Sequence, residues 1–229
     1  MTDATPLPTL TPLPLFPLQA VLYPGGLLPL RIFEVRYLDM IGRRHAAGEP
    51  FGVVCLTLGA EVRRPATGGP AGDAFAHEAF HPVGTLARID LLQRSRPGLI
   101  LIRCTGTQRF RLRRSEPGPY GLWLGDIEPI ADDAAVPVPD DLAFARTGLQ
   151  RVLRQITADL PDAPGAAEAL PIAPPHHWDD CGWLANRWCD LLPLEPAAKQ
   201  RLLEQPSPLL RLELVADVLR QMKLAVPDA

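Results

Sequence analysis

The sequence LPLFPLQAVLYPGGLLPLRIFEVRYLDMI, residues 13–41, contains the clearest structural signals in the chain. Prolines at positions 14, 17, 24 and 29 interrupt any helix in its first part, because proline lacks a backbone N–H and clashes with the preceding turn. The apolar runs 13–18 and 27–32 therefore predict two strands that tolerate an edge position, with a Pro24-Gly25-Gly26 turn between them. After Ile32, apolar residues recur at helical spacing. The stretch predicts a strand pair that leads directly into an amphipathic helix.

The composition is that of a globular protein and limits the possible functions. With 229 residues, of which 47% are apolar, the chain can bury a sizeable core. Its net charge of −3 argues against a dedicated nucleic-acid-binding domain, which is usually basic. The N-terminal residues show no signal peptide, and no apolar run approaches the ~20 residues that span a bilayer. We therefore expect a cytoplasmic protein with no membrane partner, in which Cys55 and Cys104 are buried free thiols.

The rest of the chain predicts a β-rich part followed by a helical part, an α+β fold. Further strands are expected over residues 51–58, 81–92, 99–104, 109–113 and 120–127, and helices from about residues 140, 179, 196 and 208. The composition changes at an acidic, proline-bearing stretch after residue 130. We expect a flexible arm over 1–12, a β-rich domain over 13–130, a linker over 131–139 and a helical bundle over 140–229.

Several motifs in this order resemble the N-terminal, substrate-binding domain of the Lon proteases. Residues 13–37 resemble the family pattern LPLFPL-x-x-VLYPG-x-x-LPL-x-IFE-x-RY, and residues 83–89 and 106–112 resemble VGT-x-A-x-I and G-x-x-RF-x-L. In the helical part, residues 191–212 resemble LPL…KQ-x-LLE…RL. The resemblance covers nearly the whole chain, from about residue 13 to residue 222. It implies a PUA-like pseudo-barrel with one early helix for the first part, followed by a C-terminal helical bundle.

Full-length Lon proteases also carry an ATPase module and a Ser–Lys peptidase module, whose signatures are not found in this sequence. The only lysines are Lys199 and Lys223, and neither follows a Gly-rich loop of the Walker A type. The three serines lie in no context that matches the peptidase dyad. We therefore expect a stand-alone, single-domain member of the family that is not an enzyme, with no catalytic residue, no cofactor and no metal.

The resemblance implies a binding module for unfolded or exposed apolar polypeptide. A separate ATPase or protease would be a further partner. Large aromatic side chains often anchor such contacts, which makes Phe33, Tyr37 and Trp183 the candidate polypeptide-binding residues. The simpler interpretation is that these aromatic residues belong to the hydrophobic core.

An RNA-binding PUA-like module is the first alternative. Strict alternation in RFRLR places Phe110 and Leu112 on one face of a strand and Arg109, Arg111 and Arg113 on the other, where they could follow a phosphate backbone. These arginines could equally form the solvated face of a half-buried strand, so nucleic acid is not the expected partner.

A small-molecule-binding protein or hydrolase is the second alternative. It predicts a deep polar pocket with convergent titratable groups. His176, His177, Cys181 and Cys189 do not show the paired spacing of a zinc site, so we expect loop and core residues there.

Overall fold

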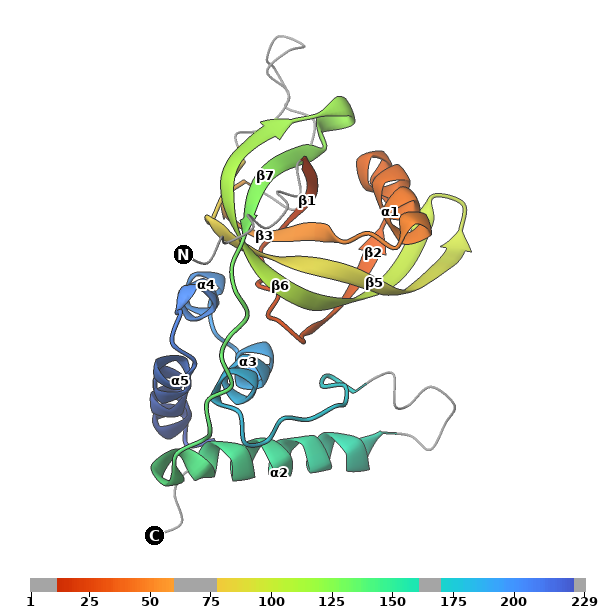
Figure 1. The fold of residues 1–229 in the computed structure, drawn as a ribbon. Coiled ribbons are helices and arrows are strands. Elements are labelled where there is room, and N and C mark those ends of the chain that lie inside the picture. The colour runs from red at the N-terminus through yellow and green to blue at the C-terminus, as the bar shows by residue number, and fades with distance from the viewer. Residues whose placement is uncertain (1–11, 60–77, 161–169, 225–229) are drawn as a thin grey trace, which may run out of the picture. The chain divides into compact units, whose positions relative to one another are not determined.

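The structure is a computed structural model that describes residues 12–59, 78–160 and 170–224 (Figure 1). It divides into two compact units, the first formed by residues 1–22 and 28–132 and the second by residues 23–27 and 133–229. Apart from Pro12, the arm expected over residues 1–12 lies outside the described residues. The segment Tyr23–Leu27 belongs to the second unit, although it follows one strand of the sheet and ends on the first residue of the next.

The first unit is a β-sheet with one α-helix (Figure 1). Its elements are β1 (Leu13–Leu18), β2 (Leu27–Ile32), α1 (Val35–Ala47), β3 (Phe51–Leu58), β4 (Ala79–Phe80), β5 (Val83–Arg96), β6 (Leu99–Pro117), the 3-10 turn η1 (Pro119–Gly121) and β7 (Trp123–Pro129). The strand–turn–strand–helix prediction for the opening stretch is confirmed. α1 ends at Gly48, whose φ of 66° is the left-handed conformation that glycine adopts at helix ends.

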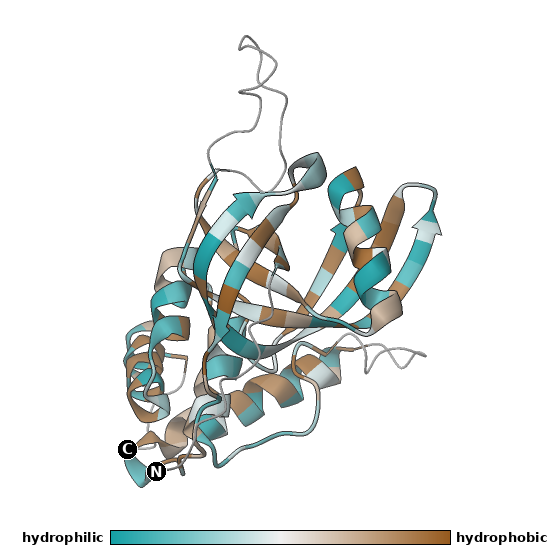
Figure 2. Ribbon diagram, turned by 45° about the horizontal axis from the view of Figure 1, so that its top comes forward, coloured by the Kyte–Doolittle hydropathy of each residue, from teal (hydrophilic) through white to brown (hydrophobic). Residues whose placement is uncertain are grey.

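Five strands close into a ring. β1 pairs with β7, β7 with β6, β6 with β5 and β5 with β3, all antiparallel, and β3 returns to pair in parallel with β1. β4 extends the sheet from β3, and β2 pairs with β6. Figure 2 shows hydrophobic and hydrophilic residues interspersed along these strands, as expected where one face of a sheet packs on a core.

β1 accommodates two prolines because each lies where the strand is paired on one side only. Residues 13–15 pair with β7, while residues 15–18 pair with β3, so only Leu15 pairs on both sides. Neither Pro14 nor Pro17 therefore has to donate a backbone hydrogen bond to a second strand, so the missing N–H is tolerated. The strand is nevertheless fully buried, which makes it part of the core of this unit.

Two predicted strand boundaries were wrong. Residues 99–104 and 109–113 form one continuous strand, β6, because the residues between them keep pairing with β5, for example Thr105 with Arg88. The strand predicted from residue 120 begins at Trp123, because the preceding residues form η1, in which Tyr120 has a left-handed φ of 58°.

The described part of the second unit contains four α-helices after the short 3-10 turn η2 (Asp140–Leu142): α2 (Ala143–Asp159), α3 (Cys181–Leu191), α4 (Pro196–Glu204) and α5 (Pro208–Met222). Asp180 caps α3 by accepting the Trp183 N–H at 2.7 Å, and Ser207 caps α5 by accepting the Leu210 N–H at 3.3 Å. Trp188 is buried and donates its indole N–H to the Ala145 carbonyl at 2.9 Å. The predicted helix starts agree with these elements.

The Pro24-Gly25-Gly26 turn is held by side chains of the second unit. Arg187 on α3 donates to the Gly25 carbonyl and, at 2.7 Å, to the Pro24 carbonyl, and it pairs with Asp190 at 3.0 Å. The Tyr23 hydroxyl donates to the Lys199 carbonyl at 2.5 Å. Burial raises the pKa of Asp190 to about 6, outweighing the opposing effect of Arg187. The turn thus belongs to the helical unit through a buried, charge-assisted network.

All four cysteines are buried free thiols, which confirms the prediction for Cys55 and Cys104. Burial raises the pKa of Cys104 to about 12, so this thiol is protonated at neutral pH.

Within the described residues, none of the helices has the length and apolar character needed to cross a membrane.

Candidate functional site

A groove of about 670 Å³ lies in the first unit, between α1 and η1. One wall is a side of α1, and the other is formed by η1 with residues of β1 and β7. The lining residues are Pro12, Pro14, Val35, Arg36, Asp39, Met40, Arg43, Arg44, Pro119, Tyr120, Leu122 and Leu124. The volume lies within the range of about 300–1,000 Å³ that is usual for ligand sites. We call this feature the α1 groove.

Arg36 joins the two walls of the α1 groove through a side-chain hydrogen bond. It is buried, and it donates to the Gly121 carbonyl of η1 at 3.3 Å. Its guanidinium also pairs with Glu34 at 2.9 Å and lies 4.4 Å from the centre of the Tyr37 ring. Of the three interactions, only the hydrogen bond to Gly121 joins α1 to η1, and the contacts with Glu34 and Tyr37 orient the guanidinium toward it.

The α1 groove exposes large apolar side chains at both of its walls. Val35 at the first turn of α1 is 75% exposed, and Tyr120 at the tip of η1 is 85% exposed. Tyr120 has a positive φ, which is uncommon for a residue other than glycine and costs on the order of 1 kcal/mol or more. The turn therefore presents the Tyr120 side chain from an unfavourable backbone conformation. Exposed apolar side chains that line a groove are typical of binding surfaces.

The charged residues at the rim of the α1 groove are paired with one another. Arg43 pairs with Asp39 at 2.9 Å, and Arg44 pairs with Glu49 at 2.5 Å. The rim therefore adds little net charge to the groove.

The structure places the three predicted polypeptide-binding residues in different environments. Phe33 is 54% exposed and lies two residues before Val35, although it does not line the α1 groove. Tyr37 is buried in the core, with its ring stacked 4.2 Å from that of Phe16. Trp183, in the second unit, is half-buried and packs edge-to-face on Trp178 at 5.1 Å. Only Phe33 is near the α1 groove in sequence and exposed.

The three arginines of the RNA-binding alternative do not form one exposed stripe. Arg109 is buried, whereas Arg111 and Arg113 are exposed. Arg113 donates to Glu128 on β7 at 2.7 Å. The prediction that Phe110 and Leu112 share one face of the strand is confirmed, because Phe110 is fully buried and Leu112 packs against the same core cluster.

His176 and His177 lie in the segment before α3, where their rings contact Trp183. Cys181 and Cys189 are buried residues of α3. In the part of the chain that the structure describes, no three His, Cys, Asp or Glu side chains converge as a metal site.

Sequence reasoning missed Val35 and Tyr120. Val35 fits the apolar stripe of α1 by spacing, yet it lies at the first helical position, beyond the reach of the core. Tyr120 lies in the turn sequence Gly118-Pro119-Tyr120-Gly121, whose composition is the signal that could have placed it at an exposed tip.

Comparison with known proteins identifies the family. Residues 12–221 match the family model of the ATP-dependent protease La (LON) substrate-binding domain. The chain belongs to this family. A Lon N-terminal domain protein from Xanthomonas campestris has a similar structure, with a TM-score of 0.65 and 27% identity over 91% of this chain and 98% of that one. No curated protein matches the chain.

The fold of the Lon substrate-binding family extends to more distant structures. The N-terminal domain of a Mycobacterium avium complex Lon protease matches with a TM-score of 0.54 and 16% identity, over 90% of this chain and 96% of that one. The resemblance inferred from the sequence motifs is therefore confirmed, including its extent along the chain. As a member of this family, the chain is a substrate-binding module similar to the N-terminal domains of Lon proteases.

Proposed function

We propose that this Lon substrate-binding domain binds unfolded or exposed apolar polypeptide in the α1 groove. The observation that carries the proposal is the pair of exposed apolar side chains, Val35 and Tyr120, on the two walls of a groove that Arg36 joins. A client side chain that enters the groove would bury these two residues and gain roughly 25 cal/mol for each Å² of apolar surface removed from water.

Phe33 extends this surface at the start of α1. Tyr37 supports it from below, because its ring lies under the Arg36 guanidinium and is not exposed to a client. Trp183 belongs to the second unit and is treated separately below. Because the rim charges are paired with one another, the groove does not select a client of one charge. It favours neutral, apolar segments, which suits a binder of unfolded chains.

The remaining expectations form part of the same proposal. The closed ring of five strands supports a PUA-like pseudo-barrel over residues 13–130, and the four helices support a helical bundle over residues 140–229. The four free thiols are consistent with a cytoplasmic location. A separate ATPase or protease would process the client that this domain captures.

The proposal is tested by fluorescence anisotropy with a labelled, reduced and carboxymethylated α-lactalbumin as the unfolded probe. Val35→Asp and Tyr120→Ser should each weaken binding about tenfold, because they place polar groups on the two apolar walls. Leu91→Asp is the matched control, since Leu91 is an exposed leucine of the same unit that does not line the groove.

Equal weakening by all three substitutions would show that binding depends on general surface hydrophobicity and not on the α1 groove. Absence of binding by the unsubstituted chain would exclude the proposed function itself. Salt-dependent binding to RNA that is lost on replacing Arg111 and Arg113 would favour the nucleic-acid alternative.

A further inference from the structure

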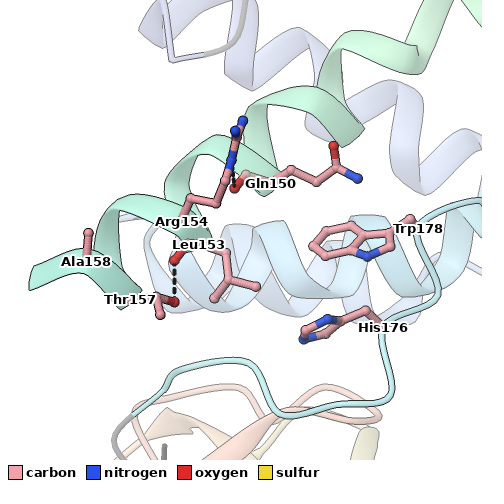
Figure 3. A pocket seen from close by; sticks show the side chains of 7 residues that line it. All are labelled: Gln150, Leu153, Arg154, Thr157, Ala158, His176 and Trp178. Atoms are coloured by element: carbon pink, nitrogen blue, oxygen red, sulfur yellow. Dashed lines mark hydrogen bonds between the residues drawn. The ribbon is translucent and has the colours of Figure 1, made fainter. Parts of the chain in front are cut away.

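A second pocket, of about 690 Å³, lies within the helical unit (Figure 3). One wall is a single face of α2, formed by residues at helical spacing, and the other comes from the segment that precedes α3. The lining residues are Gln150, Leu153, Arg154, Thr157 and Ala158 on α2, with His176 and Trp178 opposite. We call this feature the α2 pocket.

The aromatic wall of the α2 pocket is held in place by other rings. Trp178 packs edge-to-face on Trp183 at 5.1 Å, and His176 lies 5.0 Å from Trp178 and 5.9 Å from Trp183. Figure 3 shows the rings of Trp178 and His176 on the side of α2 from which Leu153 projects. This preorganised wall suits a flat aromatic group, because stacked and edge-to-face ring pairs are favourable beyond the burial of their area.

The polar groups at the α2 pocket are mainly hydrogen-bond donors. Arg154 donates from Nε to the Gln150 carbonyl at 3.3 Å, and it forms no ion pair with any residue that the structure describes. The Gln150 side-chain amide adds further donors. The Nε2 atom of His176 is buried and has no hydrogen-bond partner among the described residues. The donors of Arg154 and of the Gln150 amide, which both line the pocket, are complementary to a carboxylate.

We propose that the α2 pocket binds a polypeptide segment in which an aromatic side chain is adjacent to a carboxylate. The ring packs between Leu153 and Trp178, and the carboxylate accepts hydrogen bonds from Arg154. The choice of polypeptide as the occupant rests on the proposed function, whereas the pocket itself is separate from the α1 groove. The second unit then contributes selectivity for acidic-aromatic segments, which the apolar α1 groove does not provide.

The test follows the fluorine resonance of Trp178 in the full chain labelled with 5-fluorotryptophan, assigned through Trp178→Phe. The probe is the capped peptide acetyl-Gly-Phe-Asp-Gly-amide. It should shift the Trp178 resonance and leave that of Trp123, in the first unit, unchanged. The peptide with Asn in place of Asp should bind about three- to tenfold more weakly, as expected for the loss of a charge-assisted contact at a partly exposed site. The peptide with Ala in place of Phe should give no shift.

Arg154→Gln should weaken binding of the Phe-Asp peptide to the level of the Phe-Asn peptide, without changing binding of the latter. Arg151→Gln is the matched control, because Arg151 is a neighbouring exposed arginine of α2 that does not line the pocket. Ala158→Arg, which fills the pocket from an exposed helical position, should abolish the shift.

The proposal is overturned if Trp178 does not respond to the Phe-Asp peptide, or if Arg154→Gln and Arg151→Gln have equal effects. It is also overturned if free 3-phenylpropionate binds as tightly as the peptide, since the ligand would then be a small aromatic carboxylate. Because the readout is confined to Trp178, these outcomes are distinguishable from a failure of unfolded-protein binding at Val35 and Tyr120.

Discussion

At the scale of single residues, the glycines of the opening stretch are constrained by partners far away in the sequence. Gly25 has a φ of 74°, and a Cβ atom added there would lie 3.1 Å from Nη1 of Arg187. The sequence Pro-Gly-Gly indicated a turn, but nothing local indicated that Arg187, more than a hundred residues later, would hold its carbonyls.

Gly25→Ala should therefore destabilise the protein more than a substitution that causes backbone strain alone. Gly98→Ala is the matched control, because Gly98 has a similar φ of 77° and open space where its Cβ would lie. We expect Gly98→Ala to cost about 1 kcal/mol and Gly25→Ala about 1 kcal/mol more, because the Arg187 guanidinium must move. The free energies of unfolding in urea decide the point, and equal losses would contradict the proposed packing of this turn.

Asp190 should give stability a characteristic dependence on pH. Burial raises its pKa from 3.8 to about 6, so between these values the folded state binds more protons than the unfolded state. The contribution of Asp190 to the free energy of unfolding is then greatest below pH 4, falls as pH rises to 6 and is constant above that.

Asp190→Asn removes this titration. The difference in unfolding free energy between the unsubstituted chain and the variant should decrease by about 2 kcal/mol from pH 4 to pH 7. Urea unfolding at intervals across that range measures it. A flat difference would show that attraction to Arg187 balances the burial penalty, and a difference that increases with pH would show that it exceeds that penalty; either result would contradict the raised pKa.

At the scale of elements, the sequence predicted those whose signals are local. Both strands of the opening stretch, the end of α1 at Gly48 and the capped start of α3 at Asp180 follow from proline, glycine and capping chemistry within a few residues. The continuity of β6 was missed because the polar residues between its two apolar runs are held in the strand by pairing with β5. That pairing is a tertiary effect which no local pattern encodes.

The candidate site was predicted less well than the fold, for a related reason. Aromatic residues were identified by type, but exposure decides whether they can bind, and it is set by tertiary packing. Tyr37 faces the core, whereas Tyr120, which was predicted to begin a strand, is at an exposed turn. The arginines at 109, 111 and 113 alternate as predicted, yet Arg109 is buried.

Arg36 should be the residue that ties α1 to η1. Arg36→Met removes its hydrogen bond to Gly121 and its pair with Glu34, and we expect a loss of about 2–3 kcal/mol in unfolding free energy. Arg43→Met is the control on the same helix, because its pair with Asp39 is exposed and worth less than about 1 kcal/mol. Similar losses for the two variants would indicate that Arg36 does not hold the groove together.

At the scale of the whole molecule, the opening stretch contributes to both units. Its strands β1 and β2 belong to the sheet, and Tyr23–Leu27 belongs to the helical unit. Each unit has a pocket of its own, an apolar one beside α1 and a donor-rich one beside α2. Under the two proposals above, an apolar segment of a client binds beside α1 and an acidic-aromatic segment binds beside α2.

The central claim, that clients bind in the α1 groove, is tested most directly by site-specific photo-crosslinking. A benzophenone amino acid is placed at position 120 or, as the exposed control in the same unit, at position 91, and the chain is irradiated with unfolded casein. We predict crosslinks from position 120 that excess unlabelled casein suppresses, with little crosslinking from position 91. Equal crosslinking from both positions, or none from position 120, would contradict binding in the α1 groove.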